Sequence, residues 1–176
     1  AAFKRSTVPH GRVRSIDVSE ARALPGVVAV YTAADLAGST EPGVPGSAIM
    51  MNLMPGLRSP AVLALAADKV RYVGDPIALV VAEDRYIAED ALELIEEDIE
   101  PLEPVVTYAD ALDPAKPRLF DEYDDNVAYA SEREVGDVAG AFAKADRVIE
   151  ASIWVHRHQP VPMERRGLGS SYDRGA

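Results

Sequence analysis

The fold is decided by residues 69–106, which read KVRYVGDPIALVVAEDRYIAEDALELIEEDIEPLEPVV. KVRYV predicts a strand, because β-branched and aromatic residues favour extended backbone. Gly74–Asp75–Pro76 then interrupts the run, as a turn or bulge does. Residues 77–82, IALVVA, are continuously apolar. Such a run predicts a strand that is buried on both faces.

The second half of this stretch predicts a helix followed by an edge strand. Asp84 is a suitable N-cap for that helix. One apolar stripe follows at i, i+3, i+4, i+7 and i+11, formed by Ala88, Ala91, Leu92, Ile95 and Ile99. Residues 99–106, IEPLEPVV, then read as extended. Their two prolines cannot donate to a central ladder, so this strand belongs at a sheet edge.

The N-terminal third predicts short elements in quick succession. Residues 1–18 read as strand, turn and strand, and residues 19–26 as a short helix that stops at Pro25–Gly26. VVAVY, residues 27–31, is suited to a buried strand. Thr32 and Asp35 have the spacing of a capping box and predict a helical turn.

The C-terminal part predicts one helix and one strand after a connector over residues 107–134. Asp137 is a suitable N-cap for a short helix within residues 136–146. VIEASIWVH, residues 148–156, alternates with period two and predicts a strand. Intermingled strands and helices with short connections favour a mixed α+β fold over a doubly wound parallel sheet.

Residues 37–60 are expected to form a Met-rich loop. They hold four glycines, four prolines and three of the four methionines, without clear periodicity. Loops of this length are usually functional or flexible, and methionine-rich surfaces adapt to varied partners. Two interpretations stay open, a loop that packs on a neighbouring domain or subunit and a plain surface insertion.

Composition narrows the class of protein. The 176 residues are 48% hydrophobic and 27% charged, with no apolar run near the roughly 20 residues that span a bilayer. No cysteine is present, which excludes thiolate zinc sites and cysteine-held iron–sulfur clusters in this chain and fits a cytoplasmic location. The net charge of −11 argues against nucleic acid as a partner. Ten of the acids lie in residues 83–104, where a solvated face is favoured over a docking face.

Candidate chemistry is sparse. On a strand, His156 and His158 would share a face and Glu164 could add a carboxylate, which is a weak metal-site or hydrolase pattern. The sequence has no nucleophile elbow, no phosphate-binding P-loop and no dinucleotide fingerprint. The residues alone therefore indicate an α+β domain without a self-contained active site.

The ordered motifs resemble the large subunit of molybdenum hydroxylases, the family of xanthine dehydrogenase, aldehyde oxidase and aerobic carbon monoxide dehydrogenase. Besides residues 69–106, the resemblance rests on residues 1–36, on LFDEYDDNVAY (119–129), on GDVAGAFAKADRVIEASI (136–153) and on PMERRGLGSSYD (162–173). It implies an α/β hammerhead domain over residues 1–150. It also implies a junction over residues 151–176, where the molybdenum-cofactor-binding domain starts with its first strand.

The resemblance implies structural rather than catalytic roles for the motifs. Gly74, Asp75 and Pro76 would shape the hammerhead sheet, and Met163, Glu164, Arg166 and Gly167 would form the domain junction, with Glu164 and Arg166 paired. The family usually has proline where this chain has Arg165. No catalytic, cofactor-binding or metal-binding residue is carried over, because those positions lie downstream in the family.

For the complete subunit, the resemblance implies an oxidoreductase that hydroxylates or oxidises a small substrate at a molybdenum–pterin cofactor. Iron–sulfur clusters and FAD would lie on partner subunits or domains, in a dimer of heterotrimers. The chain opens within a strand and ends in GLGSSYDRGA, which reads as half a hairpin. We therefore expect a fragment that is inactive alone. The alternatives are a stand-alone hammerhead interaction module and a small metal hydrolase that uses His156, His158 and Glu164.

Overall fold

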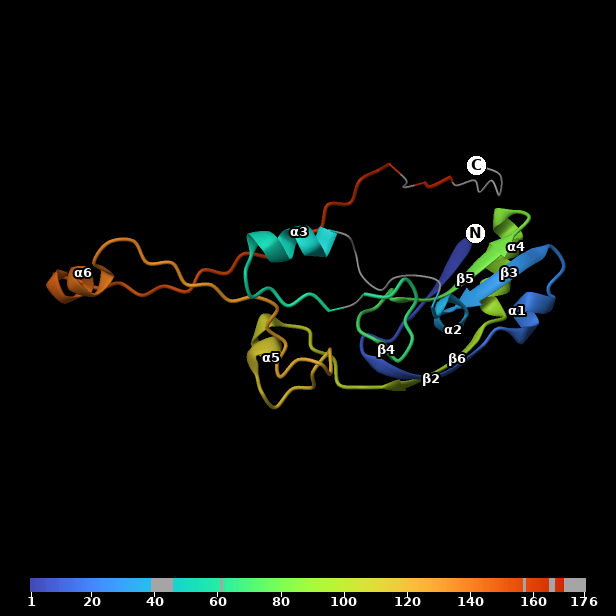
Figure 1. The fold of residues 1–176 in the computed structure, drawn as a ribbon, viewed down its shortest axis with the longest axis horizontal. Coiled ribbons are helices and arrows are strands. Elements are labelled where there is room, and N and C mark those ends of the chain that lie inside the picture. Colours follow the sequence, from blue (N-terminus) through green and yellow to red (C-terminus); the bar gives the residue numbers. More distant parts are fainter. Residues whose placement is uncertain (39–45, 61, 157, 165–166, 170–176) are drawn as a thin grey trace. The chain divides into compact units, whose positions relative to one another are not determined.

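The computed structural model describes residues 1–38, 46–60, 62–156, 158–164 and 167–169, in two compact units, Ala1–Glu132 and Arg133–Ala176 (Figure 1). The strands are β1 (Ala2–Arg5), β2 (Gly11–Asp17), β3 (Val27–Thr32), β4 (Lys69–Val70), β5 (Pro76–Ala82) and β6 (Glu96–Pro101). The helices are α1 (Ser19–Ala23), α2 (Ala33–Leu36), α3 (Gly46–Leu53), α4 (Arg85–Glu93), α5 (Tyr108–Leu112) and α6 (Val138–Lys144).

The strands of the first unit form two small antiparallel sheets. One has the order β1-β5-β3, and the other has the order β4-β2-β6. The strands β1 and β2 therefore follow each other in sequence but belong to different sheets. Val80 of β5 lies opposite Ala2 of β1 and Val30 of β3, so β5 is the central strand of its sheet. This arrangement confirms a mixed α+β fold.

The strand β5 is buried on both faces, as its continuous apolar sequence predicts. Ala78 and Val80 point to one face and join a core cluster with residues of α1 and α4, among them Ala21, Ala88 and Ala91. Ile77 points to the other face and packs with Ala66 and Val70 in a second cluster. The strand β5 thus contributes side chains to both core clusters. Its backbone N–H and C=O groups form hydrogen bonds with β1 on one side and β3 on the other.

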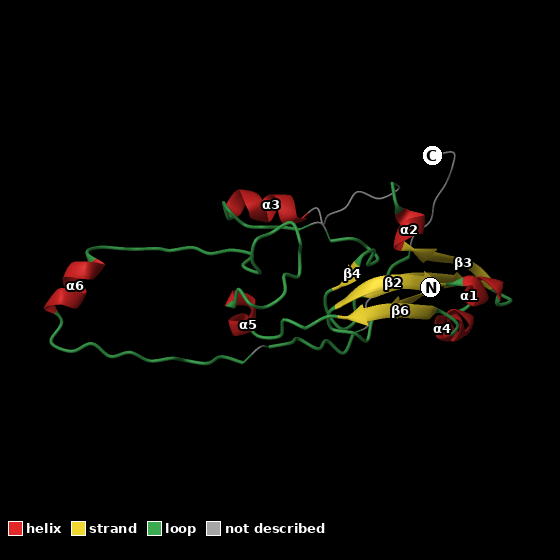
Figure 2. Ribbon diagram, turned by 90° about the horizontal axis from the view of Figure 1, so that it is seen from below, coloured by secondary structure: helices red, strands yellow, loops and turns green. Residues whose placement is uncertain are grey.

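The helix α4 begins where its cap predicts but ends earlier than the apolar stripe implies. The Asp84 carboxylate accepts a hydrogen bond from the backbone N–H of Ile87 at 2.9 Å. The helix ends at Glu93, and Ile99 lies in β6, where it pairs with Val13. The predicted helical stripe is therefore wrong at its last two positions, since Ile95 lies beyond the end of α4 and Ile99 pairs within a sheet, although Ile95 is still buried in the first core cluster. Figure 2 shows α1 and α4 close to each other at one end of the sheets.

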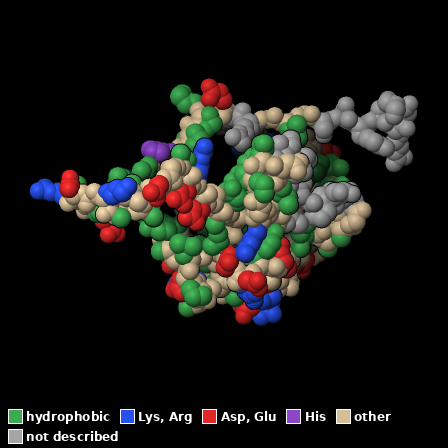
Figure 3. Space-filling view, turned by 60° about the vertical axis from the view of Figure 1, so that its left-hand side comes forward, with side chains coloured by type: hydrophobic (Ala, Val, Ile, Leu, Met, Phe, Trp, Pro, Cys, Tyr) green, Lys and Arg blue, Asp and Glu red, His purple; other side chains and the backbone are tan. Residues whose placement is uncertain are grey.

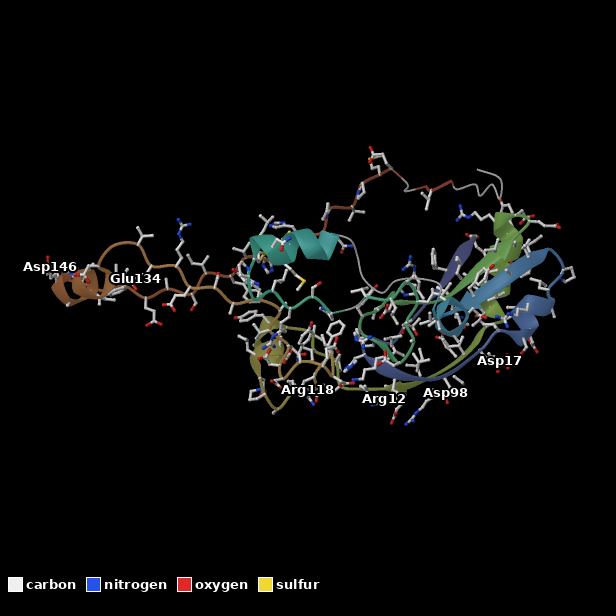
Figure 4. All side chains as sticks on the ribbon, viewed as in Figure 1. Arg12, Asp17, Asp98, Arg118, Glu134 and Asp146 are labelled. Carbon is white, nitrogen blue, oxygen red and sulfur yellow. The ribbon has the colours of Figure 1, made fainter. Side chains whose placement is uncertain are left out.

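The strand β6 occupies a sheet edge, as predicted, but it spans Glu96–Pro101 rather than residues 99–106 and contains one of the two prolines. Its acidic side chains Glu96, Asp98 and Glu100 are exposed, which discourages pairing with another chain. Its neighbour β2 comes very close at Gly11, where a Cβ atom would lie 2.5 Å from Ile99 Cγ2. Figure 4 places Arg12 and Asp98 along these two neighbouring strands. On the face seen in Figure 3, acidic and basic side chains are interspersed with hydrophobic ones.

Among the short helices of the first unit, α1 and α2 follow the sequence prediction, and α3 and α5 were missed. The helices α1 and α2 are present, and Asp35 accepts hydrogen bonds at 2.7 Å from the backbone N–H and the hydroxyl of Thr32. The Met-rich stretch contains α3, so the prediction of a pure loop over residues 37–60 is wrong. The connector contains α5, which Thr107 and Asp110 cap as a box. That box was visible in the sequence and was the available signal.

The second unit holds α6 and extended loops. Asp137 caps α6 by accepting a hydrogen bond from the N–H of Gly140 at 2.8 Å, and Glu134 and Asp146 flank this helix in Figure 4. The strand predicted for residues 148–156 is wrong, since these residues have loop conformation. A strand requires a neighbour for its N–H and C=O groups, and the structure pairs this segment with no other described segment. The predicted hairpin half falls largely on residues 170–176, outside the described residues.

The boundary at Glu132 and Arg133 separates two compact units, which is a different criterion from a boundary between domains of a family. The division at residues 150 and 151 into a hammerhead domain and a junction therefore stays a prediction. In the part of the chain that the structure describes, none of the helices has the length and apolarity to cross a bilayer.

Candidate functional site

The Gly74–Asp75–Pro76 motif forms a turn that is fixed to the end of β1. Gly74 has a φ of +96°, which glycine adopts without strain. Its N–H donates to the carbonyl of Ser6 at 2.8 Å, and the N–H of Ser6 donates to the carbonyl of Asp75 at 2.9 Å. Pro76 then begins β5. The motif thus positions the central strand against β1, as a sheet-shaping role requires.

The side chain of Asp75 does more than close this turn. It accepts a hydrogen bond from the backbone N–H of Arg71 at 3.0 Å, and the hydroxyl of Tyr72 lies close enough to lower its pKa. Burial raises the pKa of Asp75 above its usual value, against the lowering effect of these donors. Burial also raises the pKa of Tyr72, and the nearby Asp75 charge adds to that shift. Such a partly buried, perturbed carboxylate marks a candidate binding site.

Asp75 lines a cavity of about 280 Å³ whose walls are mostly apolar. The walls are formed by Val62, Leu63, Ala66, Ala67, Leu119 and Phe120. The guanidinium of Arg71 lies 4.6 Å from the centre of the Phe120 ring. Sequence reasoning named the turn but missed this cavity, because residues 62–75 and 119–120 are far apart in the chain and only the fold joins them.

A larger cavity of about 460 Å³ lies beside β2 and β4 and is lined by polar residues. The cations on its walls are Arg12, Lys69, Lys116 and Arg118, and the carboxylates are Asp113, Asp121, Asp124 and Asp125. Figure 4 labels Arg12 and Arg118. The equal numbers of positive and negative side chains leave this cavity without a net charge that would select an ionic ligand.

Lys69 and His10 anchor this polar cavity by structural contacts. The Lys69 side chain is buried, and its ammonium donates to both carboxylate oxygens of Asp121 at 2.7 Å. That hydrogen bond lowers the pKa of Asp121. His10 is buried as well, and its Nδ1–H donates to the carbonyl of Glu103 at 2.8 Å. Both side chains tie the segment after β6 to the second sheet.

The histidines that suggested a metal site are exposed on the second unit. His156 and His158 lie in loop segments, and Trp154 Nε1 donates to His156 Nδ1 at 3.3 Å. Glu164 is exposed too, and no cluster of three or more metal-ligating side chains occurs among the described residues. The structure therefore does not bring these three residues together as a site. The metal-hydrolase alternative stays a prediction, for which metal analysis of the purified chain is the test.

The proposed junction residues also lie in the second unit. Met163 is almost fully exposed, and Gly167 is exposed. Arg165 and Arg166 lie outside the described residues, so the pairing of Glu164 with Arg166 stays a prediction.

Comparison with known proteins assigns most of the first unit to a family. Residues 1–103 match the family described as "Aldehyde oxidase and xanthine dehydrogenase, a/b hammerhead domain". The chain belongs to this family. The match covers both sheets, α4 and the Gly74–Asp75–Pro76 turn, so the resemblance seen in the sequence motifs and the hammerhead fold are confirmed.

Curated relatives extend the similarity over nearly the whole chain. The carbon monoxide dehydrogenase large chain of Afipia carboxidovorans is 37% identical, over 98% of this chain and 22% of its own length. The nicotinate dehydrogenase large molybdopterin subunit of Eubacterium barkeri is 35% identical, over 98% of this chain and 37% of its own length. The chain thus spans only a minor part of these relatives.

A solved structure gives the same fold. Quinoline 2-oxidoreductase from Pseudomonas putida 86 matches with a TM-score of 0.70 and 34% identity, over 82% of this chain and 18% of that chain. Hammerhead domains of this kind are thus segments of larger oxidoreductases, and this chain is similar to such a segment.

Proposed function

We propose that this chain is the hammerhead portion of the molybdenum-containing large subunit of an oxidoreductase that hydroxylates or oxidises a small substrate. Its role there is structural, and the segment is inactive alone. The observation that carries the proposal is the family match over residues 1–103, extended by relatives that are large subunits of dehydrogenases.

The complete enzyme would carry a molybdenum–pterin cofactor on the rest of the large subunit, with iron–sulfur clusters and FAD on partner subunits or domains. The name of the nicotinate dehydrogenase relative, a large molybdopterin subunit, supports the first of these assignments. We expect a dimer of heterotrimers in the cytoplasm. When bound, the cofactor would supply the redox chemistry, and this segment would frame the approach to it.

The residues of the described chain do not fit the pterin cofactor itself. The polar cavity has four carboxylates that balance its four cations, so it offers no net positive charge to hold the phosphate of the cofactor. The cavity beside Asp75 has mostly apolar walls and another carboxylate. No step of the reaction is therefore assigned to this segment.

Residues 151–176 would begin the cofactor-binding domain. The apolar side chains of Ile149, Ile153 and Val155 are each more than 70% exposed, although their spacing suits a strand. A following domain would supply both the missing strand partner and an apolar surface to cover them. In this proposal, Met163, Glu164, Arg166 and Gly167 form the junction.

The substrate would be selected elsewhere in the large subunit. Proteins named for carbon monoxide, nicotinate and quinoline resemble this chain at 37%, 35% and 34% identity. Similarity in this region therefore does not follow the substrate.

Co-purification tests the assignment to a multi-subunit oxidoreductase. The whole gene product that contains these residues is expressed with its neighbouring genes, tagged and purified beside the tagged 176-residue chain. We expect iron, flavin and dye-linked dehydrogenase activity to accompany the whole product only, because the redox centres lie outside this segment. Dehydrogenase activity of the 176-residue chain alone would contradict the structural role.

A further inference from the structure

The cavity beside Asp75 has the composition of a small-molecule site. It lies within the first unit, between residues 62–68, the turn over residues 71–75 and the pair Leu119–Phe120. Its volume of about 280 Å³ is near the lower end of the range for ligand pockets. Such pockets combine apolar walls with a few convergent polar groups. Here the polar groups come from four residues, Asp68, Arg71, Tyr72 and Asp75.

Several apolar side chains that line the cavity are accessible to a ligand. Val62, Leu63 and Tyr72 are each about half exposed, although all three line the cavity. Exposed apolar side chains that gather around one hollow are typical of a binding site rather than of a surface that is fully solvated. The ring of Phe120, which also lines the cavity, has the guanidinium of Arg71 over it at 4.6 Å from the ring centre.

The charges around the cavity favour a cation. The Arg71 guanidinium is already engaged, since it donates to the carbonyls of Leu119 at 2.9 Å and Lys69 at 3.1 Å and lies 3.5 Å from Asp68 Oδ1. Asp75 accepts a hydrogen bond from the Arg71 N–H at 3.0 Å. A carboxylate has about four acceptor positions, so further positions remain for a ligand. With Asp68 and Asp75 against Arg71, the lining carries a net negative charge.

We propose that this cavity binds a small protonated amine with an apolar body, with the Asp75 carboxylate as its counter-ion. The apolar walls would cover the body of the ligand, and the ammonium would donate to the free acceptor positions of Asp75. A charge-assisted hydrogen bond of this kind is stronger than a neutral one. The site is independent of the molybdenum chemistry proposed for the rest of the subunit.

Binding to the ¹⁵N-labelled chain, followed by NMR, tests the site with benzylamine as the probe. Benzyl alcohol is the neutral analogue of the same shape, and benzoate is the anionic one. We expect benzylamine to shift the amide signals of residues 71–75 and 119–120 and to bind about tenfold more tightly than benzyl alcohol. Equal affinity of the alcohol, tighter binding of benzoate, or the absence of shifts at these residues would overturn the proposal.

Three variants test whether the amine binds in the cavity beside Asp75. Asp75→Asn keeps an acceptor for the Arg71 N–H and removes the charge, so the preference for the amine should disappear. Asp98→Asn makes the same charge change on the exposed edge of β6 and should leave binding unchanged. Leu63→Ala, in a half-exposed wall residue, should weaken amine and alcohol alike. Should Asp75→Asn fail to fold, unchanged binding in Leu63→Ala would itself contradict the site.

The same ammonium chemistry is present in a lysine side chain of another polypeptide. Nα-acetyl-lysine methylamide distinguishes the two sources, because it carries the ammonium on a flexible stem without an aromatic body. We expect it to bind more weakly than benzylamine. Tighter binding of the lysine derivative would overturn the assignment to a free apolar amine.

Discussion

Replacing Ile77 with alanine should lower the free energy of unfolding by about 2–5 kcal/mol, as for other large buried aliphatic residues. Ile77 is fully buried in the central strand β5, where it packs with Ala66 and Val70. The substitution removes three carbon atoms from that cluster and leaves a cavity, while the backbone is held by β1 and β3. A loss of this size is a large fraction of the stability of a typical domain.

Urea unfolding followed by circular dichroism measures this effect. Val28→Ala on β3 is the matched control, because Val28 is 68% exposed in the same sheet. The control should change stability by less than about 0.5 kcal/mol. Similar losses for both variants would contradict the placement of Ile77 in the buried cluster with Ala66 and Val70.

Removing Asp121 and removing Lys69 from their ion pair should lower the free energy of unfolding by different amounts. Asp121→Ala leaves a buried ammonium without its acceptor and should cost about 1–3 kcal/mol. Lys69→Met removes the buried charge and fills its space, and the remaining carboxylate of Asp121 is 63% exposed to water. A replacement of this kind is often neutral or stabilising, so we expect Lys69→Met to cost less than Asp121→Ala.

The pH dependence of unfolding provides the second measurement on this pair. The Lys69 hydrogen bond lowers the pKa of folded Asp121 below its unfolded value of about 3.9. The stability it contributes is therefore fully present above that unfolded pKa and is lost as the pH falls through the lower folded pKa. The difference between wild type and Asp121→Ala should narrow below pH ~4. A stability difference between wild type and Asp121→Ala that stays constant at acidic pH would contradict the role of this ion pair. Equal losses of stability in Asp121→Ala and Lys69→Met would contradict it as well.

The sequence predicted those elements whose signals are local. The apolar run of residues 77–82 identified the central strand, and Asp84, Thr32 and Asp137 marked the starts of three helices. Each signal acts within a few residues, through capping or burial of a short segment. The helical positions predicted for Ile95 and Ile99 were wrong, because α4 ends at Glu93 and Ile99 pairs with β2.

Features that depend on distant partners were not predictable. The period-two pattern of residues 148–156 suits a strand, but a strand forms only beside another segment. The cavity around Asp75 joins residues that are more than forty positions apart, and nothing local in residues 119–120 indicates that they cover the turn. The motif therefore predicted the turn but not the cavity that the turn lines.

The molybdenum content of the purified chain is the most direct test of the proposal that this hammerhead segment has a structural role. The 176-residue chain and the whole gene product are expressed in a host that makes the pterin cofactor, and molybdenum is measured by mass spectrometry. We expect molybdenum in stoichiometric amount on the whole product and only background on the 176-residue chain. Stoichiometric molybdenum and pterin on the 176-residue chain would contradict a purely structural role for this hammerhead segment.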